Sequence, residues 1–365
     1  MSELARTSPA LRRLSRMVDM VPRPQNTVAT NPEPDEKLQS ILAFMTNPAA
    51  YPEQPRSVEM VETHMSHVFI AGDLVYKMKK PIRLGPIDFT TLEARRQNCE
   101  REYALNQRLA PGIYLAVVPL MRRPDGALAL GGEGNPVEWF VLMRRLDRNQ
   151  MLDHLVAHGQ VQPADIDRLC AVLTDYYAGS PRIDISPQTL IASWHTGIDL
   201  IEKSLTDPIF ALPVDAVSRP IQALRHTLEN HAGMFVARLV EGRIVDGHGD
   251  LRPEHVYLGP QTLIIDRLEF DERLRWTDPF DETSFLGLEC ERFDAAWIGP
   301  YLIDCLSQRL QDKPLPMLLR FYRCYRACLR ARLSIEHMRD PHPRTPEKWP
   351  RQTHEYLTIA LNSLP

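Results

Sequence analysis

The chain has 365 residues, of which 44% are hydrophobic and 25% charged, and its formal net charge is -4 at pH 7. This balance is typical of a globular protein with a large core or two lobes, and it excludes the strongly basic surface of nucleic-acid-binding proteins. No apolar run approaches the ~20 residues of a membrane span. The six cysteines include no CxxC pair, so we expect reduced thiols in a cytoplasmic protein.

Residues 1–33 are predicted to form a flexible N-terminal tail. Arg6, Arg12, Arg13 and Arg16 alternate with Leu11 and Leu14, as in a short basic helix, but the following segment "VPRPQNTVATNPEPDE" has the composition of a linker. A targeting helix is the alternative, and acidic residues in the segment argue against it.

Residues 34–146 are predicted to form a compact α+β N-lobe. A first helix opens near Asp35 and carries apolar residues at helical spacing, namely Leu38, Ile41, Leu42 and Met45. Two β-rich runs joined by Gly72-Asp73 then indicate a hairpin. The stretch "LEARRQNCEREYALNQRLA" predicts a helix whose inward positions are Leu92, Cys99, Leu105 and Leu109, and three antiparallel strands follow it.

Residues 147–365 predict a helical C-lobe. Amphipathic helices are expected at 151–159, 163–180, 187–205 and 216–242, and three more around 279–293, 295–312 and 316–338. The fold class is therefore α+β and bilobal, with a connector near 143–150. A cleft between two such lobes is the usual place for a ligand.

One motif in the C-lobe combines charged residues with two short apolar runs. The segment "VDGHGDLRPEHVYLGPQTLIIDRLEF" places Asp250 before the run Val256–Leu258 and Asp266 directly after the run Leu263–Ile265. It resembles the catalytic and metal-binding loops of the protein-kinase-like superfamily, and more specifically those of the aminoglycoside phosphotransferase-like family, whose loop typically reads HGDLHPGN. The resemblance implies phosphoryl transfer from ATP, with Asp250 as the catalytic base and Asp266 as the Mg²⁺ ligand.

The resemblance assigns further residues of a nucleotide site. Lys77 in "LVYKM" would anchor the phosphates and Glu102 would orient it, although Lys79 lies on the same face of the strand and remains a competitor. Backbone groups near Met143 and Arg145 would meet the adenine. In the stretches "VYKMKKP", "RLAP", "HGDLRPEH" and "IIDRLEF", the chain also resembles a phosphotransferase-like domain found fused to a P-loop ATPase domain. This sequence has no GxxxxGK[ST], so only the kinase-like half is expected here, and a P-loop ATPase would then be a separate partner.

Two departures from the family pattern affect the expected chemistry. His255 stands where kinases keep a metal-binding asparagine, and imidazole suits Mg²⁺ poorly. The site then uses one metal, or a transition metal joins, or His255 donates a hydrogen bond to phosphate, or it only braces the loop. The expected nucleotide-covering segment "VETHMSHVF" has no glycine, so His64, Ser66 and His67 would have to substitute for backbone amides.

Other charged residues are assigned partly from the resemblance and partly from their positions in the sequence. Asp281 would brace the catalytic loop and Glu269 is a candidate metal or substrate contact, whereas most acids of "DPFDETSFLGLECERFDA" are expected in solvent. Arg323, Arg326 and Arg330 are expected to form a surface stripe.

The expected function is ATP- and Mg²⁺-dependent phosphorylation of a small-molecule hydroxyl, with no nucleic-acid or membrane partner. The alternatives are a non-catalytic pseudokinase that regulates a P-loop ATPase, and transfer of AMP.

Overall fold

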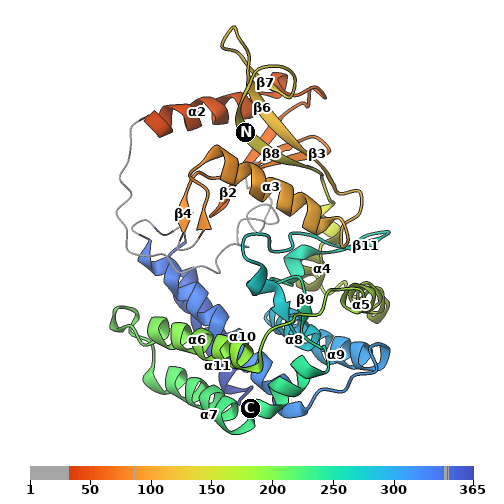
Figure 1. Ribbon diagram of the computed structural model, residues 1–365, viewed down its shortest axis with the longest axis vertical. Helices are drawn as coiled ribbons and strands as arrows, with labels where there is room; N and C mark the ends of the chain where they lie inside the picture. Colours follow the sequence, from red (N-terminus) through yellow and green to blue (C-terminus); the bar gives the residue numbers. More distant parts are fainter. Residues whose placement is uncertain (1–32, 85–86, 341–342, 344) are drawn as a thin grey trace. The chain divides into compact units, whose positions relative to one another are not determined.

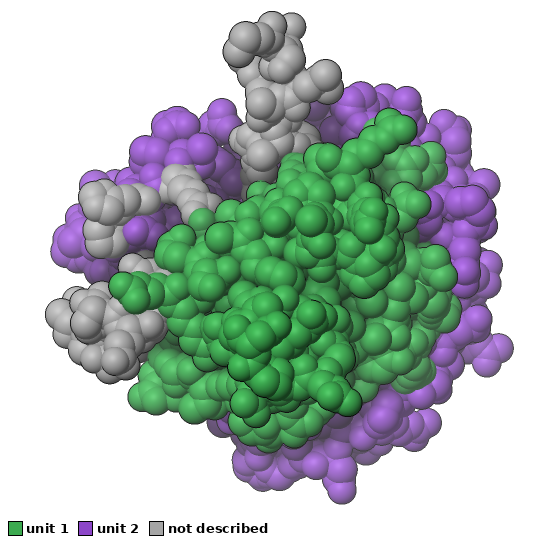
Figure 2. Space-filling view, turned by 90° about the horizontal axis from the view of Figure 1, so that it is seen from above, with its two compact units in different colours: residues 1–150, 263–270 green, residues 151–262, 271–365 purple. Residues whose placement is uncertain are grey.

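The computed structural model describes residues 33–84, 87–340, 343 and 345–365 (Figure 1). The predicted tail, residues 1–33, lies outside these ranges except for Glu33, the first residue of helix α2 (Glu33–Met45). Two compact units divide the chain: unit 1 runs to Gln150 and takes in Leu263–Phe270, and unit 2 holds Met151–Thr262 and Asp271–Pro365 (Figure 2).

Unit 1 is built on a six-stranded antiparallel sheet in the order β1-β2-β3-β8-β6-β7. Its strands are β1 (Val58–Glu62), β2 (Ser66–Ala71), β3 (Leu74–Lys79), β6 (Tyr114–Arg122), β7 (Leu128–Leu130) and β8 (Asn135–Arg144). The remaining elements are 3₁₀ turns η2 (Pro48–Ala50) and η3 (Arg148–Gln150), the short strands β4 (Arg83–Leu84) and β5 (Ile87–Asp88), and helix α3 (Leu92–Asn106). The predicted hairpin turn is present, with Gly72 at φ +62°.

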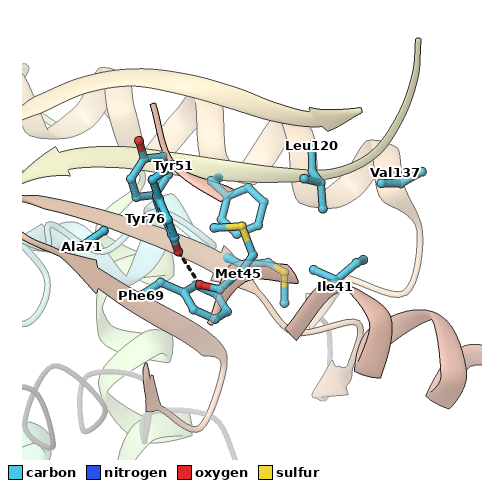
Figure 3. Close-up of a cluster of buried hydrophobic side chains, with 10 residues drawn as sticks. Ile41, Met45, Tyr51, Phe69, Ala71, Tyr76, Leu120 and Val137 are labelled. Carbon is cyan, nitrogen blue, oxygen red and sulfur yellow. Dashed lines mark hydrogen bonds between the residues drawn. The ribbon is translucent and has the colours of Figure 1, made fainter. Parts of the chain in front are cut away.

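One face of this sheet is apolar and packs on helix α2. Phe69 of β2 and Tyr76 and Met78 of β3 meet Ile41 and Met45, as the helical spacing predicted (Figure 3). The Tyr51 hydroxyl donates to the Met45 carbonyl, the dashed line in Figure 3, and so holds the end of α2 against the cluster. Burial of these side chains fixes the register of β3, because a shift by one residue would turn its apolar set away from α2.

The opposite face of β3 carries lysines. Lys77 and Lys79 alternate with Tyr76 and Met78, so both ammonium groups lie on the side away from α2. Helix α3 meets this side with a polar face, whose buried members are Arg95, Asn98, Cys99, Glu102 and Asn106. The predicted inward positions Leu92 and Leu105 are only half-buried, because buried charge pairs, and not leucines, decide which face of α3 turns inward.

Unit 2 is mainly helical. Its helices are α4 (Leu152–Ala157), α5 (Pro163–Ala178), α6 (Pro187–Leu205), α7 (Val214–Val240), α8 (Pro279–Glu291), α9 (Ile298–Arg309), α10 (Pro316–Glu336) and α11 (Lys348–Leu361). Shorter pieces are η4 (Pro208–Phe210), β9 (Val245–Asp246), η5 (Pro253–His255), β10 (Val256–Leu258), η6 (Glu272–Arg275), β12 (Trp276–Thr277) and η7 (His337–Arg339). Strand β11 (Thr262–Ile264) leads back into unit 1. The α+β class is confirmed, and α11 is a helix that the sequence analysis missed.

The arginines of α10 do not form the predicted surface stripe. Arg326 is buried and pairs with Asp281 at 2.6–2.7 Å, and Arg330 lies 3.2 Å from Glu289. Arg323 pairs with Glu291. Helix α8, expected to leave most of its acids in solvent, is buried along most of its length, because each arginine neutralises an acid that faces α10.

The expectation of six reduced cysteines is also wrong. Cys170 of α5 and Cys305 of α9 form a disulfide across 135 residues of chain, whereas Cys99, Cys290, Cys324 and Cys328 are free and buried. The spacing of the two cysteines carried no signal, since only the packing of α5 on α9 brings them together.

Within the described ranges, no helix combines the length and the hydropathy required to cross a bilayer.

Candidate active site

The predicted lysine and glutamate of unit 1 meet, and Asp266 joins them. Lys77 Nζ lies 2.8 Å from Glu102 Oε1 and 2.9 Å from Asp266 Oδ1, and all three side chains are buried. Residues 25 and 189 positions away from the lysine in sequence therefore converge on one ammonium group.

A second lysine extends this cluster. Lys79 Nζ lies 2.6 Å from the other carboxylate oxygen of Glu102, and 2.6 Å from Glu269 Oε1. The result is an alternating chain of charges, Asp266–Lys77–Glu102–Lys79–Glu269, inside unit 1. Lys79, the competitor for the phosphate-anchoring role, is thus bonded to Glu102 as closely as Lys77 is, but only Lys77 contacts Asp266.

Asp266 is held by its backbone as well as by its side chain. Its N–H donates to the Tyr114 hydroxyl at 3.0 Å, and the next N–H, of Arg267, donates to Asn106 Oδ1 at 2.9 Å. The backbone of Asp266 lies in the left-handed region at φ +66°, which few non-glycine residues adopt. Such a conformation persists where surrounding contacts determine it, and it is enriched at functional sites.

One carboxylate oxygen of Asp266 takes no part in these contacts. Oδ2 is buried and has no hydrogen-bond partner among the described residues. Burial raises the pKa of Asp266 to about 6, against the lowering effect of Lys77 and with a further rise from Glu102. An unpartnered buried carboxylate oxygen is costly unless a ligand meets it, so this atom is the point of unit 1 best suited to a hard cation.

Glu102 and Lys77 stay ionised. Burial opposes ionisation of Glu102, but Lys77 and Lys79 outweigh it and lower the pKa of the carboxyl to about 2. Burial likewise works against the charge of Lys77, and Asp266 and Glu102 together raise its pKa well above the ordinary value. The cluster therefore offers a fixed positive charge beside a carboxylate.

Met143 and Arg145, predicted to meet an adenine, lie at the end of β8. Met143 is buried opposite Val75 of β3, and the Arg145 N–H donates to the Asp73 carbonyl at 2.8 Å. That N–H is therefore already bonded within unit 1. A role in nucleotide binding stays a prediction for both residues.

The segment expected to cover the phosphates is a tight turn between β1 and β2. Thr63 Oγ1 accepts the N–H groups of Met65 at 3.2 Å and Ser66 at 2.7 Å. Two backbone amides are thus bonded to the chain's own side chain. Among the side chains named in the sequence analysis as replacements for glycine amides, Ser66 has a buried hydroxyl with no hydrogen-bond partner among the described residues. Ser66 lies on β2, directly across from Lys79 of β3.

Unit 2 holds the loop with Asp250. Arg252 Nε lies 3.0 Å from Asp250 Oδ2, and Arg252 also contacts Glu254 at 3.2 Å. The second oxygen, Asp250 Oδ1, is buried without a hydrogen-bond partner in the described part of the chain. Burial raises the pKa of Asp250 to about 6, while Arg252 and Arg330 oppose the rise. A carboxyl group with one oxygen held by a hydrogen bond and the other without a partner is suited to accept a proton.

The loop is fixed by helices α5 and α8. The Tyr176 hydroxyl donates to the carbonyls of Asp246 and Gly247, at 3.1 Å each. Glu282 accepts the N–H groups of His248 and Gly249, and the Tyr177 hydroxyl holds this glutamate at 2.8 Å. Asp281, predicted to brace the loop, instead pairs with Arg326, so its neighbour Glu282 supplies the contact.

His255 lies at the end of η5 and is fully buried. Its Nδ1 is 2.7 Å from the Asp250 carbonyl oxygen, and its Nε2 has no partner within the described residues. Burial, helped by the Arg252 charge, holds the pKa of His255 well below its usual range, so the ring is neutral.

No group of three or more His, Cys, Asp or Glu residues in the described structure is arranged to hold a metal ion by itself. Mg²⁺ often binds through one or two carboxylates and completes its coordination with phosphates and water. Asp266 Oδ2 fits that pattern. Glu269, the other candidate contact, is committed to Lys79.

Comparison with known proteins identifies relatives by sequence and solved structures with a similar fold. No family model matches the chain. An uncharacterized protein of Mycobacterium tuberculosis is 30% identical over 283 residues, which are 76% of this chain and 54% of that protein. The chain thus spans about half the length of the curated relatives it matches.

Two kinase structures match the chain over most of its length. A choline/ethanolamine kinase family protein from Mesorhizobium loti has a TM-score of 0.52 at 15% identity, covering 90% of this chain and 94% of that one. Choline kinase from Cryptosporidium parvum Iowa II has a TM-score of 0.52 at 10% identity, covering 89% and 95%. The predicted protein-kinase-like fold is therefore confirmed. These likenesses do not support a P-loop ATPase as partner.

The sequence analysis missed three contacts at the site. Nothing distinguishes Glu282 from Asp281 in "DPFDE", and the pairing of Glu269 with Lys79 joins residues 190 positions apart. A signal did exist for Arg252: it is a cation two residues from Asp250, inside a segment between buried strands, where a neutralising partner is expected.

Proposed function

We propose that this protein is an ATP- and Mg²⁺-dependent phosphotransferase, similar to aminoglycoside phosphotransferases, that phosphorylates a hydroxyl group of a small molecule. The observation that carries the proposal is the convergence of Glu102 and Asp266 on Lys77, with one oxygen of Asp266 left for a cation. The protein-kinase-like fold supports it.

Each residue has a role that follows from its contacts. Glu102 holds Lys77 in position to meet the phosphates of ATP, and Asp266 Oδ2 would hold Mg²⁺. When bound, Mg²⁺ supplies positive charge to the phosphate oxygens as the phosphoryl group transfers. Asp250 would accept the proton of the attacking hydroxyl through Oδ1, while Arg252 fixes Oδ2 and so orients the carboxyl.

A non-catalytic nucleotide-binding module is the second candidate. The turn between β1 and β2 favours it, because Thr63 already occupies two amides that a phosphate-covering loop would use. Phosphate would then be bound by Lys77 and the cation without tight enclosure, and bound nucleotide would serve regulation.

The first test is a thermal shift with ATP, with and without Mg²⁺, on the wild type and on Asp266→Asn. A ligand at a hundred times its Kd stabilises the native state by about 2.7 kcal/mol. We expect ATP to raise Tm only when Mg²⁺ is present and Asp266 is intact. If ATP shifts neither protein, nucleotide binding and with it both candidate functions are wrong.

The second test separates the two candidates. Asp250→Asn keeps the size of the side chain and removes the base, so ATP consumption should fall by roughly 10²–10⁴-fold, the usual contribution of general-base catalysis. Nucleotide affinity should stay the same, because the contact matters in the transition state. ATP consumption that is absent from the wild type, or equal in Asp250→Asn, would favour the regulatory module.

A further inference from the structure

Arg332 of helix α10 is a buried arginine of unit 2 that has no acidic partner among the described residues. The residue is 4% exposed, and all residues from Ala331 to Ile335 are buried, so solvent does not surround this part of the helix. Two of its nitrogens, Nε and Nη2, are buried and have no hydrogen-bond partner in the described part of the chain. A buried charge is costly unless a group of opposite charge meets it.

The same two nitrogens bind carboxylates in other buried arginines of unit 2. Arg326 Nε and Nη2 lie 2.7 and 2.6 Å from the two oxygens of Asp281. Arg238 Nε and Nη2 lie 2.6 and 3.0 Å from the two oxygens of Asp278. This pair of N–H groups points in one direction, so it can donate to two oxygens of a single carboxylate or phosphate. In Arg332 neither member of the pair has an acceptor among the described residues.

The helical repeat explains why α8 supplies acids to two arginines of α10 but not to Arg332. Arg326 and Arg330 are four residues apart and share the face that meets α8. Arg332 follows Arg330 by two residues, which turns its side chain by about 200° around the helix axis. Tyr325, seven residues before Arg332, shares its face and packs on Trp194 of α6, with ring centroids 4.7 Å apart. Arg332 therefore lies on the side of α10 that faces α6.

The acids near that side are already paired. Helix α6 contains two acids, Asp199 and Glu202, and both contact Arg225 of α7, at 2.7 and 2.5 Å. Glu336, one turn after Arg332, is held by an arginine of η7 at 2.8 Å. Burial lowers the pKa of Arg332, and the charge of Glu336 offsets this only in part. A guanidinium nevertheless keeps its charge at neutral pH, so the donors still require an anion.

We propose that Arg332 binds one oxyanion of a small molecule, with Nε and Nη2 donating to two oxygens of a carboxylate or a phosphate group. The guanidinium fork selects this class of ligand, because its parallel donors match two oxygens of one group. The residues that carry the argument all belong to unit 2. The site takes no part in the proposed nucleotide binding, so it does not rest on the proposed function.

The test measures the Tm of the whole protein in sodium chloride, sodium phosphate and sodium acetate at one pH and one ionic strength. An anion that binds the native state raises Tm by mass action, and a titration then gives its Kd. We expect a saturable rise in the wild type with phosphate, with acetate or with both, which distinguishes a phosphate site from a carboxylate site. Arg332→Met should weaken this binding by about tenfold or more, because a buried charge pair loses one member. Arg320→Met removes an exposed arginine of the same helix and should bind as the wild type does.

The variants also report on the unpaired charge when neither phosphate nor acetate is added. Arg332→Met keeps an aliphatic stem and removes the buried charge, so its Tm in dilute chloride should equal or exceed that of the wild type. Arg326→Met is the matched control, since it leaves Asp281 buried without its cation and should lower Tm. If Arg332→Met lowers Tm as much as Arg326→Met does, Arg332 has a structural role and the proposal is wrong.

Two results with the wild type would also overturn the proposal. If neither phosphate nor acetate raises Tm above its value in chloride, Arg332 binds no oxyanion of this class. If the rise is equally large in Arg332→Met, the anions act elsewhere on the protein or through the solvent. Nucleotide binding and ATP consumption are measured without reference to Arg332, so each of these results leaves the proposed phosphotransferase as it stands.

Discussion

Lys77 and Lys79 are two residues apart on one strand, yet their surroundings give them different tasks. Both contact Glu102, but Lys77 also contacts Asp266, whereas Lys79 also contacts Glu269. Glu269 follows Asp266 by three residues, so its bond to Lys79 fixes the segment that carries Asp266 to strand β3. Under the proposed function, these contacts assign Lys79 the role of a positioning residue and Lys77 that of the phosphate anchor.

We predict that Lys79→Met destabilises the protein by about 3–5 kcal/mol, because it leaves Glu269 buried without its cation. The matched control is Lys80→Met, the next residue, whose partner Glu62 is partly exposed; its effect should be about 0–1 kcal/mol. Urea unfolding measures both.

The double variant Lys79→Met with Glu269→Gln tests the cause. Removing the stranded carboxylate should restore part of the lost stability, since Glu102 keeps Lys77. If the two substitutions simply add, the pairing of Lys79 with Glu269 contributes little, and the positioning role is wrong.

The sequence was informative at this scale where chemistry and alternation coincide. The period of two along "LVYKMKK" assigns Lys77 and Lys79 to one face, and the resemblance to kinases selects Glu102 as the partner of Lys77. Asp266 was expected only as the Mg²⁺ ligand, and its contact with Lys77 was not expected. The sequence could not choose between Asp281 and Glu282, because that choice depends on which face of α8 meets the loop. The sequence also could not predict that α3 buries its polar face, since side chains such as Arg95 are normally expected to face solvent.

At the scale of elements, the loop with Asp250 is fixed by the close approach of strand β12 and helix α8. A Cβ at Gly247 would lie 2.4 Å from the Thr277 methyl group and 2.8 Å from Glu282 Oε2. Glycine is thus required for the packing that lets Glu282 reach the loop amides. The motif "HGDLRPEH" marks this loop in the sequence, but the helices that hold it contribute residues 70 or 71 positions before and 33 or 34 positions after the groups they contact, beyond any local pattern.

We predict that Gly247→Ala destabilises the protein by about 1–3 kcal/mol, the cost of an extra methyl group in a close-packed site. Gly233→Ala is the matched control. Gly233 lies within α7, and its added Cβ would meet nothing within 4 Å. Alanine is the better helix former, so this variant should gain roughly 0.5–1 kcal/mol. Equal Tm values for the two variants would show that the approach at Gly247 is not tight.

At the scale of the whole molecule, the chain crosses between its two units more than once. Residues 263–270 lie far from the rest of unit 1 in sequence, yet they supply Asp266 and Glu269 to it. The first division, between Gln150 and Met151, lies where strands give way to helices, the same change from which the sequence analysis expected a boundary at residue 146. The inclusion of residues 263–270 in unit 1 could not be predicted, because it depends on charge pairs between segments that are distant in sequence.

This discontinuity makes a fragment an informative test. Residues 33–150 alone would contain Lys77 and Lys79 with Glu102 but without Asp266 or Glu269, and the Tyr114 hydroxyl would lose its backbone donor. Two buried ammonium groups would then share one carboxylate, and the net buried positive charge is costly. We expect the fragment to show no cooperative thermal transition by circular dichroism, whereas the same fragment with residues 263–270 appended through a flexible linker should recover one. A fragment that melts cooperatively without the appended segment would mean that α3 and the sheet fold independently of Asp266, and that this carboxylate is brought to a site already formed.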